Sequence, residues 1–64
     1  MAIDRPLDFL NELKNSLICV NTKDGKKAEG TLLAFDIHIN LVIKEKKGNK
    51  FIRGDLINSI EAID

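Results

Sequence analysis

At the centre of the sequence lies Phe35-Asp36-Ile37-His38-Ile39-Asn40-Leu41-Val42-Ile43, in which polar residues interrupt two apolar runs. Aspartate, histidine and asparagine alternate there, and this histidine is the single one in the chain. In an extended backbone the three polar side chains share one face, with Ile37 and Ile39 pointing into the core. The segment lacks the Gly and Pro that hairpin turns favour. It is therefore interpreted as a junction kept for its side chains.

The length of 64 residues predicts one small domain. A chain of this size buries only roughly 60% of its unfolded surface, so disulfides, a metal or oligomerisation commonly add stability. Cys19 is the single cysteine, which excludes an internal disulfide, and it is interpreted as a small buried apolar residue rather than a reactive thiol. A metal site needs more His and Cys ligands than this chain holds. We therefore predict an oligomer without a cofactor.

The charge balance limits the partners. Ten basic and ten acidic residues cancel, so an anionic partner must be met by a local patch rather than by a basic surface. No apolar run approaches the ~18 residues of a membrane span, and no signal-peptide pattern is present. Together with one unpaired cysteine, these features predict a cytoplasmic protein.

A short helix is expected over residues 6–14, after a loose leader at residues 1–4. Pro6 suits the first turn, where its missing N–H has no partner to lose. Leu7, Leu10 and Leu13 recur every three residues and give the helix one apolar face. Asn15 can end the helix in the left-handed conformation. A helix this short is unstable alone, so it must pack against the rest of the chain.

Five strands are predicted after the helix, over residues 17–20, 27–35, 41–46, 50–53 and 56–63. Asp24-Gly25 predicts a hairpin turn, and Gly30 predicts a bend or a close backbone approach. Tight turns between consecutive strands indicate an antiparallel meander, and five strands in so short a chain indicate a strongly bent sheet or small open barrel. The class is mainly β. Its two edge strands invite pairing with further copies, as a ring or a filament.

Two sets of residues are given structural interpretations. The lysines are expected to form a solvated edge that opposes aggregation, and the phenylalanines are expected in the core. The lysines are Lys44, Lys46, Lys47 and Lys50, and the phenylalanines are Phe9, Phe35 and Phe51.

The sequence resembles the Sm-like (LSm) protein family in two motifs. Asp24-Gly25, Gly30-Thr31-Leu32 and the run 35–43 resemble the first Sm motif, and the run 51–60, Phe-Ile-Arg-Gly-Asp-Leu-Ile-Asn-Ser-Ile, resembles the second. The opening Arg5-Pro6-Leu7-Asp8 is similar to the start of archaeal Sm-like proteins. The resemblance implies a single domain over residues 1–64, with the motif regions at about 17–46 and 50–63. One departure is the segment 45–50, which is shorter than in many relatives.

This resemblance implies a helix on a bent five-stranded sheet and a homo-oligomeric ring of six or seven subunits. It implies binding of single-stranded, uridine-rich RNA on the inner rim, in a non-enzymatic scaffold or chaperone role in RNA processing. The residues that match the family's RNA-binding pocket are His38, Asn40, Arg53 and Asp55. Asp36 matches the residue that supports the loop, and Gly54 the one that lets the backbone turn beside the base.

The side-chain chemistry suits a base. The His38 ring and the Arg53 guanidinium are flat and can hold a base between them, and stacking is worth ~1–3 kcal/mol per base. Asn40 offers both a donor and an acceptor, which complement uracil but face a mismatch at N3 of cytosine. Three alternatives stay open: a ring that serves mainly as a protein-interaction platform, a Cys19–His38 enzyme, and a metal site that Asp36 and His38 would form around a ring.

Overall fold

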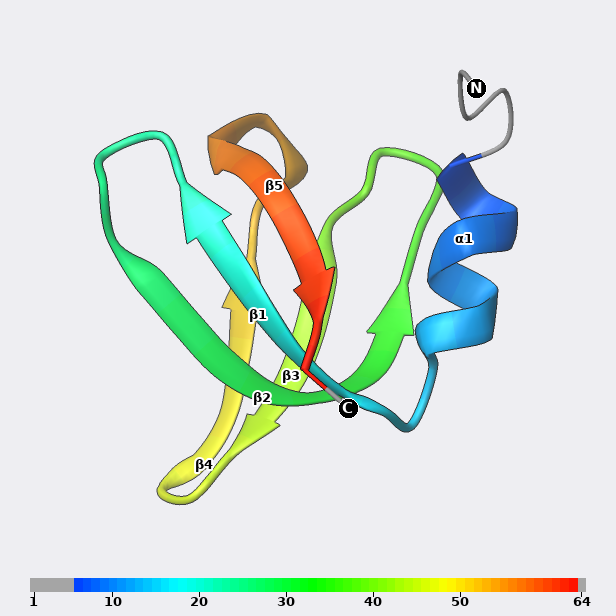
Figure 1. Ribbon diagram of the computed structural model, residues 1–64, viewed down its shortest axis with the longest axis horizontal. Helices are drawn as coiled ribbons and strands as arrows, with labels where there is room; N and C mark the ends of the chain where they lie inside the picture. Colours follow the sequence, from blue (N-terminus) through cyan, green and yellow to red (C-terminus); the bar gives the residue numbers. More distant parts are fainter. Residues whose placement is uncertain (1–5, 64) are drawn as a thin grey trace.

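The computed structural model describes residues 6–63 as one helix and five strands, with a 3-10 turn before the last strand (Figure 1). The elements are α1 (Pro6–Leu13), β1 (Leu17–Thr22), β2 (Lys27–Phe35), β3 (Leu41–Glu45), β4 (Gly48–Ile52), η1 (Gly54–Leu56) and β5 (Ile57–Ala62). The predicted fold class, a short helix followed by a bent five-stranded antiparallel sheet, is confirmed. The predicted leader at residues 1–4 lies outside the described residues.

The strands form one sheet in the order β4-β3-β2-β1-β5. The predicted meander is therefore correct for the first four strands and wrong for the fifth, which pairs with β1 instead of β4. The curvature of the sheet explains the difference, because the connection that follows β4 reaches the end of β1, where the Lys23 N–H donates to the Leu56 carbonyl at 2.9 Å. A short connection then suffices for the chain to cross from one edge of the sheet to the other. Strands β4 and β5 are left as the two edges.

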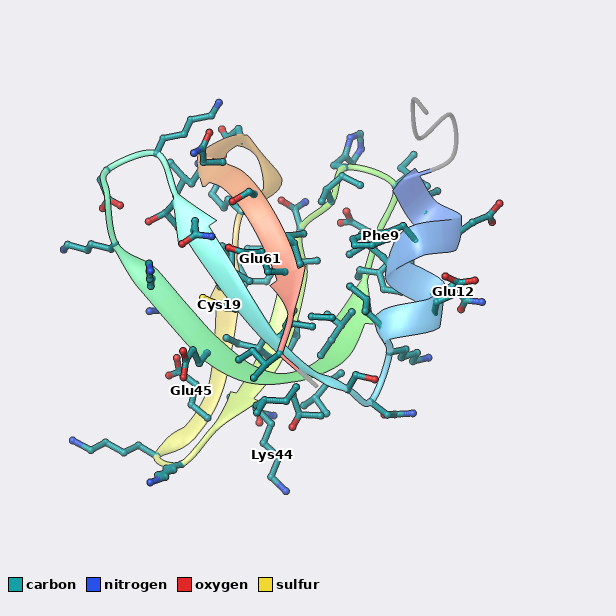
Figure 2. All side chains as sticks on the ribbon, viewed as in Figure 1. Phe9, Glu12, Cys19, Lys44, Glu45 and Glu61 are labelled. Carbon is teal, nitrogen blue, oxygen red and sulfur yellow. The ribbon has the colours of Figure 1, made fainter. Side chains whose placement is uncertain are left out.

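The core lies inside the curve of the sheet, and the helix covers one end of it. The fully buried side chains alternate along the strands, as expected where one face of a strand is buried. Leu10 is the helix residue that joins them, and Figure 2 shows the neighbouring Phe9 on the side of α1 that faces the sheet. The buried hydrophobic residues are Leu10, Ile18, Val20, Ala28, Leu32, Leu41, Ile43 and Ile52.

Two predicted backbone features are confirmed. Asn15 ends the helix region with a φ of 71°, and its N–H donates to the Leu32 carbonyl at 2.7 Å. Gly30 lies against the backbone of β3, since a Cβ at Gly30 would be 2.7 Å from the Lys44 carbonyl oxygen. Beyond this point the register of β2 and β3 shifts between Leu32 and Ala34, an irregularity that bends a strand. The two halves of β2 thus serve two parts of the sheet.

The fourth strand differs from its predicted position. The turn falls at residues 46–47 and β4 begins at Gly48, earlier than the predicted start at residue 50. Phe51 is 62% exposed, so its predicted place in the core is wrong. The alternation of the strand gives the reason: Ile52 takes the buried position, which turns Phe51 to the opposite face of an edge strand.

Candidate nucleic-acid interface

The junction predicted between the second and third strands is a turn, so the extended backbone that would place its polar side chains on one face does not form. The Ile39 N–H donates to the Asp36 carbonyl at 3.0 Å, and the Asp36 N–H to the Asn40 carbonyl at 3.2 Å. Ile37 is 73% exposed, so its predicted core position is wrong, whereas Ile39 is half-buried and packs against the core. An aspartate that bonds the backbone two residues ahead competes with the strand ladder, and this explains the turn.

The carboxylate of Asp36 holds this turn together. Its Oδ1 accepts from the His38 N–H at 2.8 Å and from the Asn40 N–H at 3.1 Å, and its Oδ2 accepts from Asn40 Nδ2 at 3.0 Å. These bonds, the one from the Asn40 side chain foremost, hold the pKa of the Asp36 carboxyl below its usual value. Asp36 therefore stays ionised at neutral pH and fixes the orientation of its neighbours.

Asn40 joins this turn to the connection between β4 and β5. Its Oδ1 accepts from the Gly54 N–H at 2.6 Å, although the two residues are far apart in the sequence. Gly54 lies so close to the turn that an added Cβ would be 1.9 Å from the His38 carbonyl oxygen and 2.9 Å from the Ile39 carbonyl carbon. No side chain fits there without a movement of backbone. The absence of a side chain at Gly54 thus allows the two connections to touch.

Arg53 and Asp55 flank this glycine. Arg53 Nη2 and Asp55 Oδ2 are 3.1 Å apart, and the two side chains are 68% and 63% exposed. An ion pair this exposed adds little to the free energy of unfolding. Its effect is to restrain the direction of the flat guanidinium group, whose faces stay accessible.

Five of the six predicted site residues line one open hollow of about 450 Å³. They are His38, Asn40, Arg53, Gly54 and Asp55, and Asp36 supports the hollow through its hydrogen bonds to the turn. The hollow offers an imidazole ring, a guanidinium plane and an amide. This set combines faces for stacking with an edge for hydrogen bonding, the two means by which unpaired bases are recognised.

The amide of Asn40 keeps part of its hydrogen-bonding capacity free. Asp36 accepts one of the two Nδ2 hydrogens, and Gly54 donates to one lone pair of Oδ1. One donor and one acceptor site remain on the amide. Since an acceptor faces Nδ2 and a donor faces Oδ1, these partners also decide which end of the amide is which.

Ile39 is a feature of the site that sequence reasoning missed. Its φ is 63°, a left-handed conformation that β-branched residues rarely adopt. Strained residues of this kind persist where their surroundings fix them. Here the Asp36 bonds on one side and the backbone of Gly54 on the other hold the turn. Nothing in the residue type signals this, because Asn or Gly is the usual occupant of such a position.

Residues 6–63 contain no group of three or more His, Cys, Asp or Glu side chains that could hold a metal ion. Within the same range, no helix has the length and apolar character needed to cross a membrane.

Comparison with known proteins gives concordant results. The LSM domain family matches residues 8–62. An snRNP Sm-like protein of Archaeoglobus fulgidus is 39% identical over 64 aligned residues, which cover 83% of each chain. The SmAP (LSm) protein of Methanococcus vannielii has a crystal structure that superposes with a TM-score of 0.84, at 31% identity, over 91% of this chain and 96% of that one. The Sm protein of Pyrococcus abyssi, solved in complex with a uridine heptamer, superposes with a TM-score of 0.83, at 28% identity, over 92% and 99%.

Proposed function

Because this chain belongs to the Sm-like (LSM domain) family, we propose that it forms a ring of identical subunits that binds single-stranded, uridine-rich RNA. The observation that carries the proposal is the Asn40 amide, held between Asp36 and Gly54 in a hollow that His38 and Arg53 also line. The complex of the Pyrococcus abyssi protein with a uridine heptamer supports the same ligand class.

In this proposal one base enters the hollow and lies between the imidazole of His38 and the guanidinium of Arg53. Each face contact contributes to stacking, which is worth ~1–3 kcal/mol per base in single-strand sites. Asp55 holds Arg53 in place, so less side-chain freedom is lost when the base enters.

Asn40 gives the preference for uracil. Its free Oδ1 lone pair accepts from the uracil N3–H, and its free Nδ2 hydrogen donates to a neighbouring uracil carbonyl. Cytosine has an acceptor at N3, which faces the same Oδ1 without a bond. The fixed amide cannot rotate to correct this mismatch, because rotation breaks its bonds to Asp36 and Gly54.

The edge strands supply the ring contact. β4 and β5 each leave one side of the sheet unpaired, and pairing of β4 in one copy with β5 in the next gives a head-to-tail contact that can close. Exposed apolar side chains lie on or beside these edges, among them Phe51, Leu56 and Ile63. A ring of six or seven copies repeats one weak base pocket, so that binding of the first nucleotide raises the effective concentration of the next.

A ring with these pockets acts as a scaffold or chaperone for RNA rather than as an enzyme. The hollow presents groups that stack and hydrogen-bond, and Asp36 is occupied with three structural bonds rather than poised to move a proton. The exposed apolar residues favour one second candidate, a ring that mainly binds other proteins.

Fluorescence anisotropy with labelled oligo(U), competed by oligo(U), oligo(C) and oligo(A) at one salt concentration, tests the proposal. We expect oligo(U) to compete best, and Asn40→Ala to weaken oligo(U) binding and abolish the preference. Asn11→Ala, which alters an exposed asparagine on α1 away from both sheet edges, is the matched control and should leave both unchanged. Equal competition by the three oligomers would exclude the uracil pocket, and absence of RNA binding by an assembled ring would favour the protein-binding candidate.

A further inference from the structure

A second hollow adjoins the connection that carries the candidate base pocket. It has a volume of about 310 Å³ and lies between the β1–β2 turn, the start of β2 and the end of β4, with Leu56 of η1 in its wall. Four lysines line it, namely Lys23, Lys26, Lys27 and Lys50. Asp24 is the one acidic residue among its lining residues. The hollow is thus strongly cationic in a chain whose net charge is zero.

The backbone ties the lysine-bearing turn to the base pocket. The Lys23 N–H donates to the Leu56 carbonyl at 2.9 Å, and the Leu56 N–H donates to the Arg53 carbonyl at 3.1 Å. The β1–β2 turn therefore rests on the same short connection that presents Arg53, Gly54 and Asp55. Figure 1 shows this turn and the start of β5 at the same end of the molecule. The lysine-bearing turn and the base pocket are therefore joined through the same short connection.

The base pocket differs in charge from the lysine-lined hollow. At the base pocket, Arg53 is paired with Asp55, and Asp36 adds a further negative charge. With His38 counted as neutral, the pocket and its support carry a net charge of −1, which repels the phosphates of a bound strand. The pocket can recognise a base but cannot neutralise the backbone attached to it.

The four lysine side chains that line the second hollow are not held in ion pairs like that of Arg53 and Asp55. None of the four side chains forms a salt bridge or a side-chain hydrogen bond within residues 6–63. Asp24 is already engaged, because its carboxylate accepts from the Thr22 hydroxyl and from the Lys26 backbone N–H. The hydrogen bond from Thr22 is the main reason that the pKa of Asp24 lies below its usual value. Lys26 also interacts with the charge of Asp24. All four lysines are exposed, beside a base pocket that has no net positive charge.

We propose that Lys23, Lys26 and Lys27 form a phosphate-binding site that holds the RNA backbone next to the nucleotide in the base pocket. The inference rests on the proposed function and extends it to a second contact, independent of base identity. Lysine suits this role as a mobile point charge that needs no fixed geometry. The apolar part of the hollow, around Phe51, lies on the β4 edge that the proposed ring contact covers, so the phosphate site is confined to the turn.

The test compares two triple variants that remove equal charge. Lys23→Gln/Lys26→Gln/Lys27→Gln alters the proposed site, and Lys44→Gln/Lys46→Gln/Lys47→Gln alters the exposed end of the β3–β4 hairpin. Binding of a labelled uridine heptamer is measured as a function of salt. We expect the first variant to bind roughly tenfold more weakly at low salt, and its log–log salt slope to be smaller by about 2, since each lost phosphate contact removes about 0.7. The hairpin variant should keep the wild-type slope.

A neutral ligand sharpens the result. A uridine heptamer with methylphosphonate linkages keeps its bases and loses its backbone charge, so the first variant should bind it as tightly as wild type does. Equal loss of slope in both triple variants, or an unchanged slope in the first, would overturn the inference. A changed sedimentation coefficient of the first variant would also overturn it, because the hollow would then belong to the contact between copies. If the phosphate site is overturned in one of these ways but wild-type protein still prefers oligo(U) over oligo(C), the proposed function remains supported.

Discussion

The connections that precede and follow strand β3 are very different. At its start, the turn over residues 36–40 has its backbone bonded to itself and to the Asp36 carboxylate, and it is packed against the backbone of Gly54. At its other end, the turn at residues 46–47 is exposed, and its side chains form no hydrogen bond within residues 6–63. Figure 2 shows Lys44, just before this second turn, pointing away from the sheet.

This difference between the two turns distinguishes the structure needed to reverse the chain from the structure needed to position the site residues. Either connection reverses the chain, but the second does so with two residues and the backbone of Gly48 at a φ of 134°. The first uses more hydrogen bonds and keeps Ile39 in a left-handed conformation, which a fold alone has no reason to retain. A strained turn held by several hydrogen bonds is expected where side chains must be fixed in place before a ligand binds.

The largest contrast between the two connections is expected from their glycines. Gly54→Ala places a methyl group against the His38 carbonyl and must displace backbone, so we expect loss of oligo(U) binding by roughly a hundredfold or more, with about 1–3 kcal/mol lost from the free energy of unfolding. Gly48→Ala meets no atom within 4 Å but is strained by its φ, so it should lower stability and leave binding unchanged. Thermal unfolding and anisotropy measure the two effects.

Retention of oligo(U) binding by folded Gly54→Ala would show that the contact between the two connections is not needed for the site. Equal loss of binding in both glycine variants would show instead that binding follows overall stability.

The next largest effect is expected from the stacking groups. His38→Ala and Arg53→Ala should each weaken oligo(U) binding by about 1–3 kcal/mol, which is roughly fivefold to 150-fold. Neither change should alter the free energy of unfolding by more than about 0.5 kcal/mol, because both side chains are exposed. Lys47→Ala at the other turn is the control for loss of an exposed cation. If Lys47→Ala weakened oligo(U) binding as much as Arg53→Ala does, Arg53 would act only through its positive charge and not by stacking on a base.

Sequence reasoning placed the elements of the fold well because the signals were local. The strand predicted over residues 27–35 matches the bounds of β2, and Asp24-Gly25 predicted a turn in which Gly25 has a φ of 86°. The return of β5 to β1 was missed, since it depends on how far the whole sheet bends. The position of Phe51 was missed for a related reason: its exposure follows from the register of β4 on β3, and not from its own residue type.

The members of the candidate site were named from motifs, but their arrangement was not derivable from periodicity. Asp36, His38 and Asn40 would share one face in an extended backbone, but the carboxylate of Asp36 folds the segment into a turn instead. The bond from Gly54 to Asn40 joins residues from different motifs and depends on tertiary structure. The left-handed backbone of Ile39 is a product of both constraints, so no local pattern could predict it.

A smaller effect is expected from pH. The pKa of Asp36 lies below its value in the unfolded chain, so its stabilisation is complete above that unfolded value and is lost as the pH falls through the folded pKa. Between about pH 5 and pH 2 we expect hydrogen exchange at the His38 and Asn40 amides, corrected for intrinsic rates, to lose protection. Asp36→Asn should remove that dependence.

Asp24→Asn provides the matched control for this titration, because Asp24 has a lowered pKa in a different turn. It should change protection at the Lys26 amide, to which Asp24 is bonded, and leave His38 and Asn40 as they are in wild type. Persistence of the pH dependence at His38 in Asp36→Asn would contradict the assignment to Asp36.

The smallest effect is expected at Ile37, the one apolar residue in the first turn that the core does not hold. An exposed isoleucine contributes little burial, so Ile37→Ser should change the free energy of unfolding by no more than about 0.5 kcal/mol. Ile39→Ser should cost more, about 1–3 kcal/mol, since Ile39 packs against the core. Denaturant unfolding distinguishes the two. Equal losses of stability would support an extended segment in which both isoleucines point into the core. The expected inequality would show that the hydrogen-bonded turn buries Ile39 against the core and leaves Ile37 exposed to solvent.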